Sequence, residues 1–289
     1  MPQTNRYETA EAGDRYHDFC LWPYMPIGSC AGKLRSSGLL FHSFAAAGMP
    51  DRVYELIGAI RNGFGVSNTV WGVKLVGGAL RWEFYFYDYR RNDRERSMTR
   101  LLELIRPLVA CDIPVNENHH YFMFSIDITT DLMAKSGALE EIHMYIGNPG
   151  STVSSGICYA LTGGPPRLEN IYYFFDAETQ ADDISAKIVC SSHIDTTHIA
   201  PEEILWPEMT GCRVIVVANK PENDAVYFSG IDVGQLLFFL RRMGYPSAVV
   251  SFIEENRPRL DHLRYDVGFD YRMENGSLAI LKSGFYGIF

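Results

Sequence analysis

The alternation of polar and apolar positions in residues 80–91 predicts a strand with two unlike faces. Because side chains alternate along a strand, Trp82, Phe84 and Phe86 fall on one face. The opposite face carries Arg81, Glu83, Tyr85, Tyr87 and Tyr89. The apolar face is expected to pack against a layer of helices, whereas tyrosines among charged groups need a surrounding that is enclosed but polar. The pattern therefore predicts a polar cavity lined by tyrosines.

The same periodicity predicts helices that alternate with pairs of strands along the chain. The expected helices cover residues 51–63, 97–109, 179–190, 233–244 and 248–257. The expected strands cover residues 69–76, 80–89, 121–128, 141–148, 155–162, 168–176, 213–220, 224–231, 264–273 and 277–289. Gly77-Gly78 and Asn275-Gly276 stand between two of these strand pairs and predict tight hairpins. No helix fits between Asn148 and Ser155.

Ten strands in five hairpins, with helices between them, predict an α+β fold. Antiparallel strands in this number seldom stay an open sheet, because twist and exposed edges favour closure. Eight strands are just filled by their own side chains, so a larger barrel leaves a lumen. We expect residues 46–289 to form one domain, a closed ten-stranded antiparallel barrel of repeated αββ units with helices outside and a solvent-filled lumen. Residues 1–45 are an N-terminal extension of unknown role.

Composition and charge restrict the partners. Hydrophobic residues make up 47% of the 289 residues, which supports a large core. The formal net charge of -9 and the pI near 5.4 argue against nucleic acid as a partner. The N-terminal residues lack an apolar signal core, and no segment approaches the ~20 apolar residues of a membrane span, so we expect a cytoplasmic protein without a membrane partner. Six widely spaced cysteines predict buried thiols and no disulfide framework.

The polar faces of the other expected strands supply candidate lumen residues. They are Tyr121, Met123, Ser125, Asp127, Glu141, His143, Tyr145, Tyr227, Ser229, Asp266, Gly268, Asp270 and Arg272. Buried ionisable groups must be paired or solvated, so such a lumen is either a network of ion pairs or the binding site of a charged ligand. Arginine and lysine can hold a diphosphate, while tyrosine faces stabilise a carbocation and exclude water. That combination is typical of the transfer of an allylic group.

Three segments of the sequence, taken in their order along the chain, resemble a known family. They are LRWEFYFYD at residues 80–88, FSIDITTDLMAKSGALEEIHMYI at residues 124–146 and NDAVYFSGIDVGQL at residues 223–236. Together they resemble the ABBA aromatic prenyltransferases, and most of all the cyanobactin (ribosomal peptide) prenyltransferases. The resemblance covers most of the chain from about residue 51. It implies a barrel that binds an allylic diphosphate, usually dimethylallyl diphosphate, and an aromatic acceptor, either an indole or phenol or an aromatic side chain of a peptide.

The resemblance, together with the expected lumen faces, implies site residues for both halves of the donor. Arg81 resembles a diphosphate-binding arginine, and Tyr145, Tyr173 and Tyr227 resemble the aromatic shield of the allylic group. The full set of expected substrate-binding residues is Arg81, Lys74, His143, Lys282, Tyr85, Tyr145, Tyr173 and Tyr227.

The sequence also departs from the family pattern. The fourth strand carries Glu141 and Tyr145 where the family alternates lysine and arginine, and Ser229 replaces an arginine on the eighth strand. With fewer cations, a diphosphate needs Mg²⁺ as a companion, and Asp127 and Glu141 are the expected metal ligands. No organic cofactor is expected. The acidic residue of the family's first strand has no counterpart, so Glu83 is our candidate for the general base.

Two other functions stay open at this point. The missing basic positions favour a non-catalytic barrel that binds a ligand or a peptide. A cyclase or isomerase could instead protonate its substrate through Glu83, Glu141 and Asp270. The lumen distinguishes these functions, since it should be net positive with a tyrosine collar in a transferase, neutral and greasy in a binding barrel, or rich in carboxylates in a cyclase.

Overall fold

The fold is given by a computed structural model that describes residues 7–14, 24, 26, 28–88, 94–134, 137–148 and 153–289. Its strands are β1 (Thr69–Val76), β2 (Ala79–Tyr87), β3 (Tyr121–Ile128), β4 (Ile142–Gly147), β5 (Ser154–Leu161), β6 (Arg167–Asp176), β7 (Val214–Asn219), β8 (Asp224–Ile231), β9 (Tyr265–Glu274) and β10 (Ser277–Ile288). Its α-helices are α1 (Ser37–Ala46), α2 (Arg52–Phe64), α3 (Met98–Ile105), α4 (Thr130–Ala134), α5 (Ala181–Val189), α6 (Val233–Arg242), α7 (Ser247–Glu255) and α8 (Arg257–Leu260). Two 3-10 turns, η2 (Pro201–Glu203) and η3 (Pro207–Met209), follow α5.

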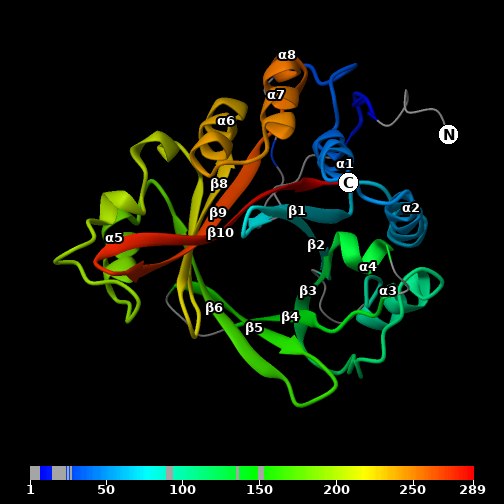
Figure 1. Ribbon diagram of the computed structural model, residues 1–289, viewed down its shortest axis with the longest axis horizontal. Helices are drawn as coiled ribbons and strands as arrows, with labels where there is room; N and C mark the ends of the chain where they lie inside the picture. Colours follow the sequence, from blue (N-terminus) through cyan, green and yellow to red (C-terminus); the bar gives the residue numbers. More distant parts are fainter. Residues whose placement is uncertain are drawn as a thin grey trace.

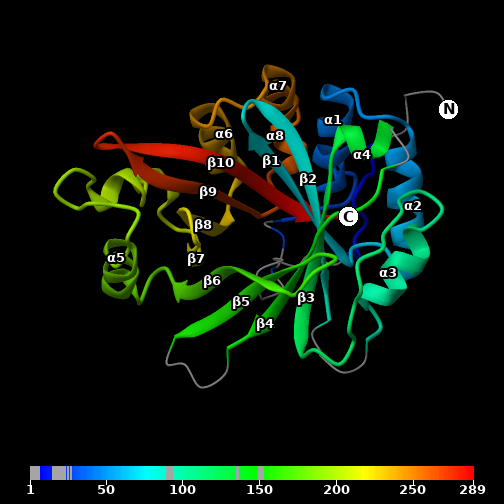
Figure 2. The same ribbon diagram turned by 60° about the horizontal axis from the view of Figure 1, so that its bottom comes forward.

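The ten strands form one closed antiparallel barrel (Figures 1 and 2). Each strand pairs with its neighbours in the sequence, and β1 pairs with β10 to close the ring. The ends of the expected strands lie within two residues of the observed ones, and Tyr89 lies outside the described residues. The helices lie on the outside of the barrel. The predicted fold, a closed ten-stranded barrel with helices outside, is therefore confirmed.

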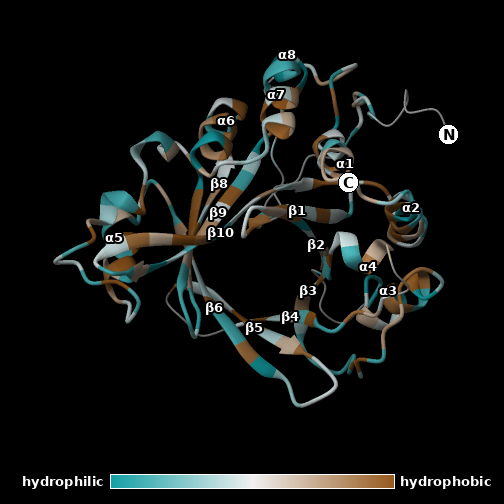
Figure 3. Ribbon diagram, viewed as in Figure 1, coloured by the Kyte–Doolittle hydropathy of each residue, from teal (hydrophilic) through white to brown (hydrophobic). Residues whose placement is uncertain are grey.

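The two faces of β2 explain its unusual sequence. Trp82, Phe84 and Phe86 are fully buried against the outer layer. The indole Nε1 of Trp82 donates a hydrogen bond to Ser43 Oγ of α1 at 2.8 Å, and the Phe86 ring packs on Phe64 of α2 with centroids 5.5 Å apart. Figure 3 shows hydrophilic and hydrophobic residues following one another along β5 and β6. One face of the sheet therefore forms the main core beneath the helices, and the other lines the lumen.

Two hairpin predictions are confirmed by the backbone. Gly77 and Gly78 have φ angles of 56° and 81°, and Asn275 and Gly276 have φ angles of 52° and 78°. Two successive positive φ angles are the signature of the tight turn that matches the twist of antiparallel strands. Both hairpins lie at the same end of the barrel, because each follows an odd-numbered strand.

Helices α1, α4 and α8 were not expected from the sequence, apart from the first residue of α8. Helix α1 is buried on most of its sides, so its sequence SGLLFHSFAA shows no clear helical period, and α4 has only 5 residues. The boundary that we placed after residue 45 falls inside α1, which packs on the barrel. Just before it, Ser36 Oγ donates to the Ile288 carbonyl oxygen at 2.6 Å. None of the helices in the described ranges is long and apolar enough to cross a membrane.

Candidate functional site

The lumen contains two adjoining chambers of opposite character. The polar chamber encloses about 960 Å³, part of it open to solvent, and is lined by Lys74, Glu83, Tyr85, His143, Tyr145, Arg167, Glu169, Asn170, Tyr172, Lys220, Pro221, Glu222, Asn223, Tyr227, Gly268, Asp270, Lys282, Ser283, Gly284 and Tyr286. The aromatic chamber encloses about 660 Å³, also partly open, and is lined by Tyr85, Tyr87, Phe122, Met123, Tyr145, Gly156, Tyr172, Phe174, Val216, Tyr227 and Tyr286. Five tyrosines belong to both linings and therefore mark the boundary between the chambers.

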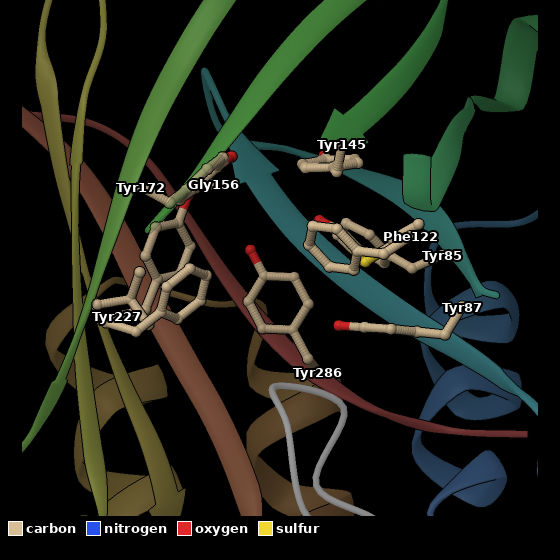
Figure 4. Close-up of a pocket in the computed structure, with 11 residues that line it drawn as sticks. Tyr85, Tyr87, Phe122, Tyr145, Gly156, Tyr172, Tyr227 and Tyr286 are labelled. Atoms are coloured by element: carbon tan, nitrogen blue, oxygen red, sulfur yellow. The ribbon is translucent and has the colours of Figure 1, made fainter. Parts of the chain in front are cut away.

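These five tyrosines form a closed ring around the lumen, which we call the tyrosine ring. Figure 4 shows Tyr85, Tyr145, Tyr172, Tyr227 and Tyr286 turned toward one another across the cavity. Going around the ring, the centroid separations are 6.4 Å (Tyr85–Tyr145), 6.0 Å (Tyr145–Tyr172), 6.3 Å (Tyr172–Tyr227), 6.4 Å (Tyr227–Tyr286) and 6.1 Å (Tyr286–Tyr85). Each even-numbered strand, from β2 to β10, contributes one of these residues. The repeated hairpins of the barrel thus build the ring.

Hydroxyl groups of the tyrosine ring make hydrogen bonds on the polar side. The Tyr85 hydroxyl donates to Glu83 Oε2 at 2.6 Å, and the Tyr172 hydroxyl accepts from Asn170 Nδ2 at 2.9 Å. The Tyr145 hydroxyl lies 3.3 Å from Ser125 Oγ. Burial raises the pKa of all five phenols well above the usual value, so they stay neutral at physiological pH. The faces of these five rings line the aromatic chamber.

Glycines make room for two of these rings. A Cβ at Gly268 would lie 2.2 Å from Tyr227 Cδ1, and a Cβ at Gly72 would lie 2.7 Å from Tyr286 Cδ1. Both distances are far below van der Waals contact. Tyr227 and Tyr286 therefore lie directly over the backbone of the neighbouring strand, and only glycine permits this approach.

Glu83 is the centre of a buried ion-pair cluster in the polar chamber. It forms an ion pair with Lys74 and accepts a hydrogen bond from Ser125 Oγ at 2.6 Å, and His143 Nδ1 lies 3.8 Å away. Burial opposes ionisation, but the positive charge of Lys74, with that of His143, lowers the pKa of Glu83 to about 2. A carboxylate of such low pKa is a weak proton acceptor, which disfavours Glu83 as the general base.

A second cluster surrounds Asp270 of β9 in the polar chamber. Lys220 Nζ lies 2.6 Å and Lys282 Nζ lies 3.4 Å from Asp270 Oδ2, and Asn223 Nδ2 donates to the same oxygen at 3.0 Å. Burial opposes ionisation here as well, yet the nearby Lys220 lowers the pKa of Asp270. Repulsion by Lys220, together with burial, lowers the pKa of Lys282. Lys282 is therefore the more weakly held of the two lysines.

The third cluster lies at the rim of the polar chamber. His143 Nε2 is 3.0 Å from Glu141 Oε1, and Arg167 is 3.1 Å from Glu141 Oε2. The hydrogen bond from His143 lowers the pKa of Glu141. Burial alone would lower the pKa of His143, but its bond to Glu141 and the charge of Glu83 raise it. His143 consequently binds its proton more tightly than a free imidazole.

The charges that line the polar chamber balance. The cations are Lys74, Arg167, Lys220 and Lys282, and the carboxylates are Glu83, Glu169, Glu222 and Asp270. With His143 neutral the described lining has no net formal charge, and with His143 protonated it carries a single positive charge. The lumen thus combines a tyrosine collar with a balanced ion-pair network, which matches none of the three charge patterns that we set out from the sequence.

The structure brings together seven of the expected site residues. Lys74, Glu83, Tyr85, His143, Tyr145, Tyr227 and Lys282 all line the polar chamber. Arg81 does not line either chamber. It is exposed near the start of β2 and pairs with Lys74 in the β1–β2 ladder. Its role in diphosphate binding stays a prediction without support from the geometry.

The assignment of Tyr173 to the lumen is wrong. Its ring lies on the outside of the barrel, where Lys187 Nζ of α5 is 4.0 Å from the ring centroid. Tyr172 takes the inward position. The run Tyr-Tyr-Phe-Phe at residues 172–175 is aromatic at every position, so its own pattern cannot distinguish the two faces. Asn170, a polar residue two positions before Tyr172, is the signal that indicates the correct face.

Two further residues of the site were missed. Tyr286 has the same parity as Lys282 on β10, so the alternation rule would have placed it in the lumen. Lys220 lies in the turn after β7, and its approach to Asp270 joins residues that are 50 positions apart. Nothing in the local sequence indicates that pairing. Tyr121, conversely, was expected inside and is buried in the outer core.

The expected metal ligands are already paired with cations. Asp127 Oδ1 lies 3.2 Å from Lys74 Nζ, and Glu141 is held by His143 and Arg167. Among the described residues, no three histidine, cysteine or acidic side chains are grouped so that they could hold a metal ion. A Mg²⁺ ion that arrives with a diphosphate needs only one or two protein carboxylates, and the half-exposed Asp127 is accessible for that role.

Comparisons with known proteins establish the fold class. No family model matches the sequence. The solved structures with the same fold include the apo form of the prenyltransferase PriB (TM-score 0.54, 9% identity, covering 88% of this chain and 94% of that one) and a 6-dimethylallyl tryptophan synthase (TM-score 0.50, 12% identity, covering 88% and 96%). The barrel therefore has the ABBA fold of the aromatic prenyltransferases. A specific link to the cyanobactin prenyltransferases stays a prediction.

One curated protein also matches the sequence. The chain is 24% identical over 298 residues to the putative JmjC domain-containing protein L887 of Acanthamoeba polyphaga mimivirus. The match covers 89% of this chain but 47% of that protein, so the chain spans about half the length of this relative.

Proposed function

We propose that this protein is a prenyltransferase that moves a dimethylallyl or other short allylic group from its diphosphate to an electron-rich aromatic acceptor. The observation that carries the proposal is the tyrosine ring, which separates a chamber with lysines and a histidine from a chamber without charged lining residues. The reaction needs this order of surroundings. The donor has an anionic diphosphate at one end and a reactive allylic group at the other, and the apolar acceptor must lie next to that group. The fold shared with prenyltransferases supports the same conclusion.

In this proposal the diphosphate occupies the polar chamber near Lys220, Lys282 and His143, which offer charge-assisted hydrogen bonds. The allylic carbon lies at the level of the tyrosine ring. When its bond to oxygen breaks, the electron pair leaves with the diphosphate, and the aromatic faces stabilise the allylic cation and exclude water. The acceptor in the aromatic chamber then forms the new bond.

The acceptor ring must finally lose a proton. Glu83 has a pKa of about 2 and is a weak base. The expelled diphosphate, in the same chamber, is a stronger one, so we propose that it receives the proton directly or through a group of the lining.

The balanced charge of the polar chamber determines how the donor is neutralised. A diphosphate is strongly anionic, whereas the described lining carries at most one positive charge beyond its carboxylates. We therefore propose that Mg²⁺ accompanies the diphosphate, with Asp127 and Glu141 as its carboxylate ligands. His143, whose pKa is raised, would contribute a further positive charge.

The same observations bear on the two alternatives. A cyclase needs a carboxylic acid that can give up a proton, but Glu83, Glu141 and Asp270 all have lowered pKa values and are ionised. That alternative is disfavoured. A non-catalytic binding barrel is the second candidate, because the balanced ion-pair network needs no ligand to satisfy it.

Calorimetric titration with dimethylallyl thiodiphosphate, with and without Mg²⁺, tests the proposal. We expect micromolar binding that is stronger with Mg²⁺. The variant Lys282→Gln should weaken binding about tenfold, because one charge-assisted contact is lost. Its fold should survive, since Asp270 keeps Lys220 at 2.6 Å.

The matched control for this variant is Lys187→Gln. It removes the same charge from the outside of the barrel, where Lys187 lies over Tyr173. Equal affinity of both variants and the unaltered protein would remove Lys282 from the donor site. No binding in either condition would favour the non-catalytic barrel.

A further inference from the structure

The aromatic chamber contains no charged side chain among the described residues that line it. Its wall beyond the tyrosine ring consists of Tyr87, Phe122, Met123, Gly156, Phe174 and Val216. The polar contacts found for Tyr85 and Tyr172 go to Glu83 and Asn170 on the polar side. The chamber therefore offers ring faces and aliphatic surface to its occupant, but no counter-ion.

The nearest carboxylate along the chain is also engaged elsewhere. Asp88 follows Tyr87 directly, yet its side chain is buried and accepts a hydrogen bond from Arg94 at 2.9 Å. The guanidinium of Arg94 lies 3.7 Å from the ring centroid of Tyr121, which belongs to the outer core. This ion pair is satisfied within the outer layer and does not line the aromatic chamber.

An ionised group that leaves water for the part of this chamber closed off by its ring walls pays a large desolvation penalty. Moving an unpaired ammonium or carboxylate out of water costs several kcal/mol, which exceeds what the burial of one ring contributes. A free aromatic amino acid carries both charges within a few bonds of its ring. If the ring filled the aromatic chamber, its two charged groups would have no partner among the described lining residues.

We infer that the aromatic chamber selects an uncharged aromatic group. Its ligand is an indole or phenol ring with no ionised substituent close to it, supplied either by a neutral small molecule or by an aromatic side chain within a peptide. A free aromatic amino acid does not fit this chemistry. That the bound ring is a prenyl acceptor rests on the proposed function, whereas the preference for an uncharged ring rests on the lining alone.

Calorimetric titration with a series of indoles tests the inference on the unaltered protein. The probes are indole, N-acetyltryptophan amide, tryptophan, tryptamine and indole-3-propionate, each with and without dimethylallyl thiodiphosphate. We expect the neutral probes to bind and the three ionised probes to bind at least about tenfold more weakly. Tryptophan binding as tightly as its neutral amide would overturn the inference. So would the absence of binding by every probe.

A charge placed in the wall gives a second, independent measurement. Met123 lines the aromatic chamber, and Met123→Lys should raise the affinity for indole-3-propionate relative to that for indole by about tenfold. The control Met123→Gln is similar in size and neutral, and it should leave that ratio unchanged. An unchanged ratio in Met123→Lys, with the neutral probes still bound, would place the ligand elsewhere and overturn the inference.

Further probes distinguish a peptide ligand from a small molecule, and they distinguish this inference from the proposed function. An acetylated, amidated tripeptide with central tryptophan that binds more tightly than indole indicates a peptide ligand, and the reverse order indicates a small molecule. Both results agree with an uncharged ring. Binding of neutral probes without any binding of the thiodiphosphate would remove the proposed function and leave this inference standing.

Discussion

At the scale of single residues, the pair formed by Lys74 and Glu83 is the clearest case of two groups that stay charged although they are buried. The exposed fraction of the side chain is 14% for Lys74 and 4% for Glu83. Removing the cation from such a pair leaves the buried carboxylate without its closest positive charge, with His143 Nδ1 3.8 Å away. We therefore expect Lys74→Met to lower the free energy of unfolding by about 3 kcal/mol, measured by chemical denaturation.

The double variant Lys74→Met/Glu83→Gln is the control for this prediction. It removes both charges while the amide keeps partners for Tyr85 and Ser125, so most of the lost stability should return. If the double variant is as unstable as Lys74→Met alone, the loss comes from packing and not from the unpaired carboxylate.

At the scale of elements, the tyrosine ring depends on glycines in the strands next to it. The clearest example is Gly268 of β9, whose missing side chain leaves room for the ring of Tyr227 on β8. In Gly268→Ala the new methyl group would lie 2.2 Å from Tyr227 Cδ1, so that ring must move. We expect a loss of about 1–3 kcal/mol in unfolding free energy and a changed near-ultraviolet circular dichroism spectrum of the tyrosines.

Gly163→Ala serves as the comparison for this change. An added Cβ at Gly163 meets no other atom within 4 Å, and the backbone there has no positive φ, so stability and spectrum should stay as they are. A Gly268→Ala protein with an unchanged spectrum would show that Tyr227 does not lie over this strand.

The strands themselves could be predicted because alternation is a local property. The ranges of β3 and β8 agree with the expectation residue for residue, and the Gly-Gly and Asn-Gly hairpins form as expected. Site residues could not be predicted where the inward face of a strand was ambiguous, as for Tyr172. Nor could they be predicted where the contact joins residues distant in the sequence, as for Lys220. The low pKa of Glu83 depends on three elements that meet only in the closed barrel, so no sequence pattern indicates it.

The repeat of the elements would have supplied part of what was missed. Each hairpin gives one tyrosine from its second strand, so Tyr85, Tyr145 and Tyr227 together predict a counterpart on β6 and on β10. Tyr172 and Tyr286 are those counterparts. The regularity is visible only when the five hairpins are aligned with one another instead of being considered one at a time.

At the scale of the whole molecule, closure of the barrel ties every strand to two neighbours. No strand among the described residues is left with a free edge, because β1 pairs with both β2 and β10. A ladder without ends should unfold as a unit, since opening it at any one seam exposes both the lumen and the core beneath the helices. The seam between β1 and β10 can be tested directly through Phe289.

Phe289 follows β10 and is 2% exposed, and its backbone N–H donates to the Thr69 carbonyl oxygen at 2.9 Å. Its ring stands perpendicular to Phe84, with centroids 5.2 Å apart. We expect Phe289→Ala to lower the unfolding free energy by about 3–5 kcal/mol. In contrast, Ile280→Ala on the same strand, where the side chain is 43% exposed, should change it by less than about 1 kcal/mol. Tryptophan fluorescence and far-ultraviolet circular dichroism should give one common midpoint in both variants. Separate midpoints in Phe289→Ala would mean that the seam opens before the rest of the barrel and that the ladder is not a single cooperative unit.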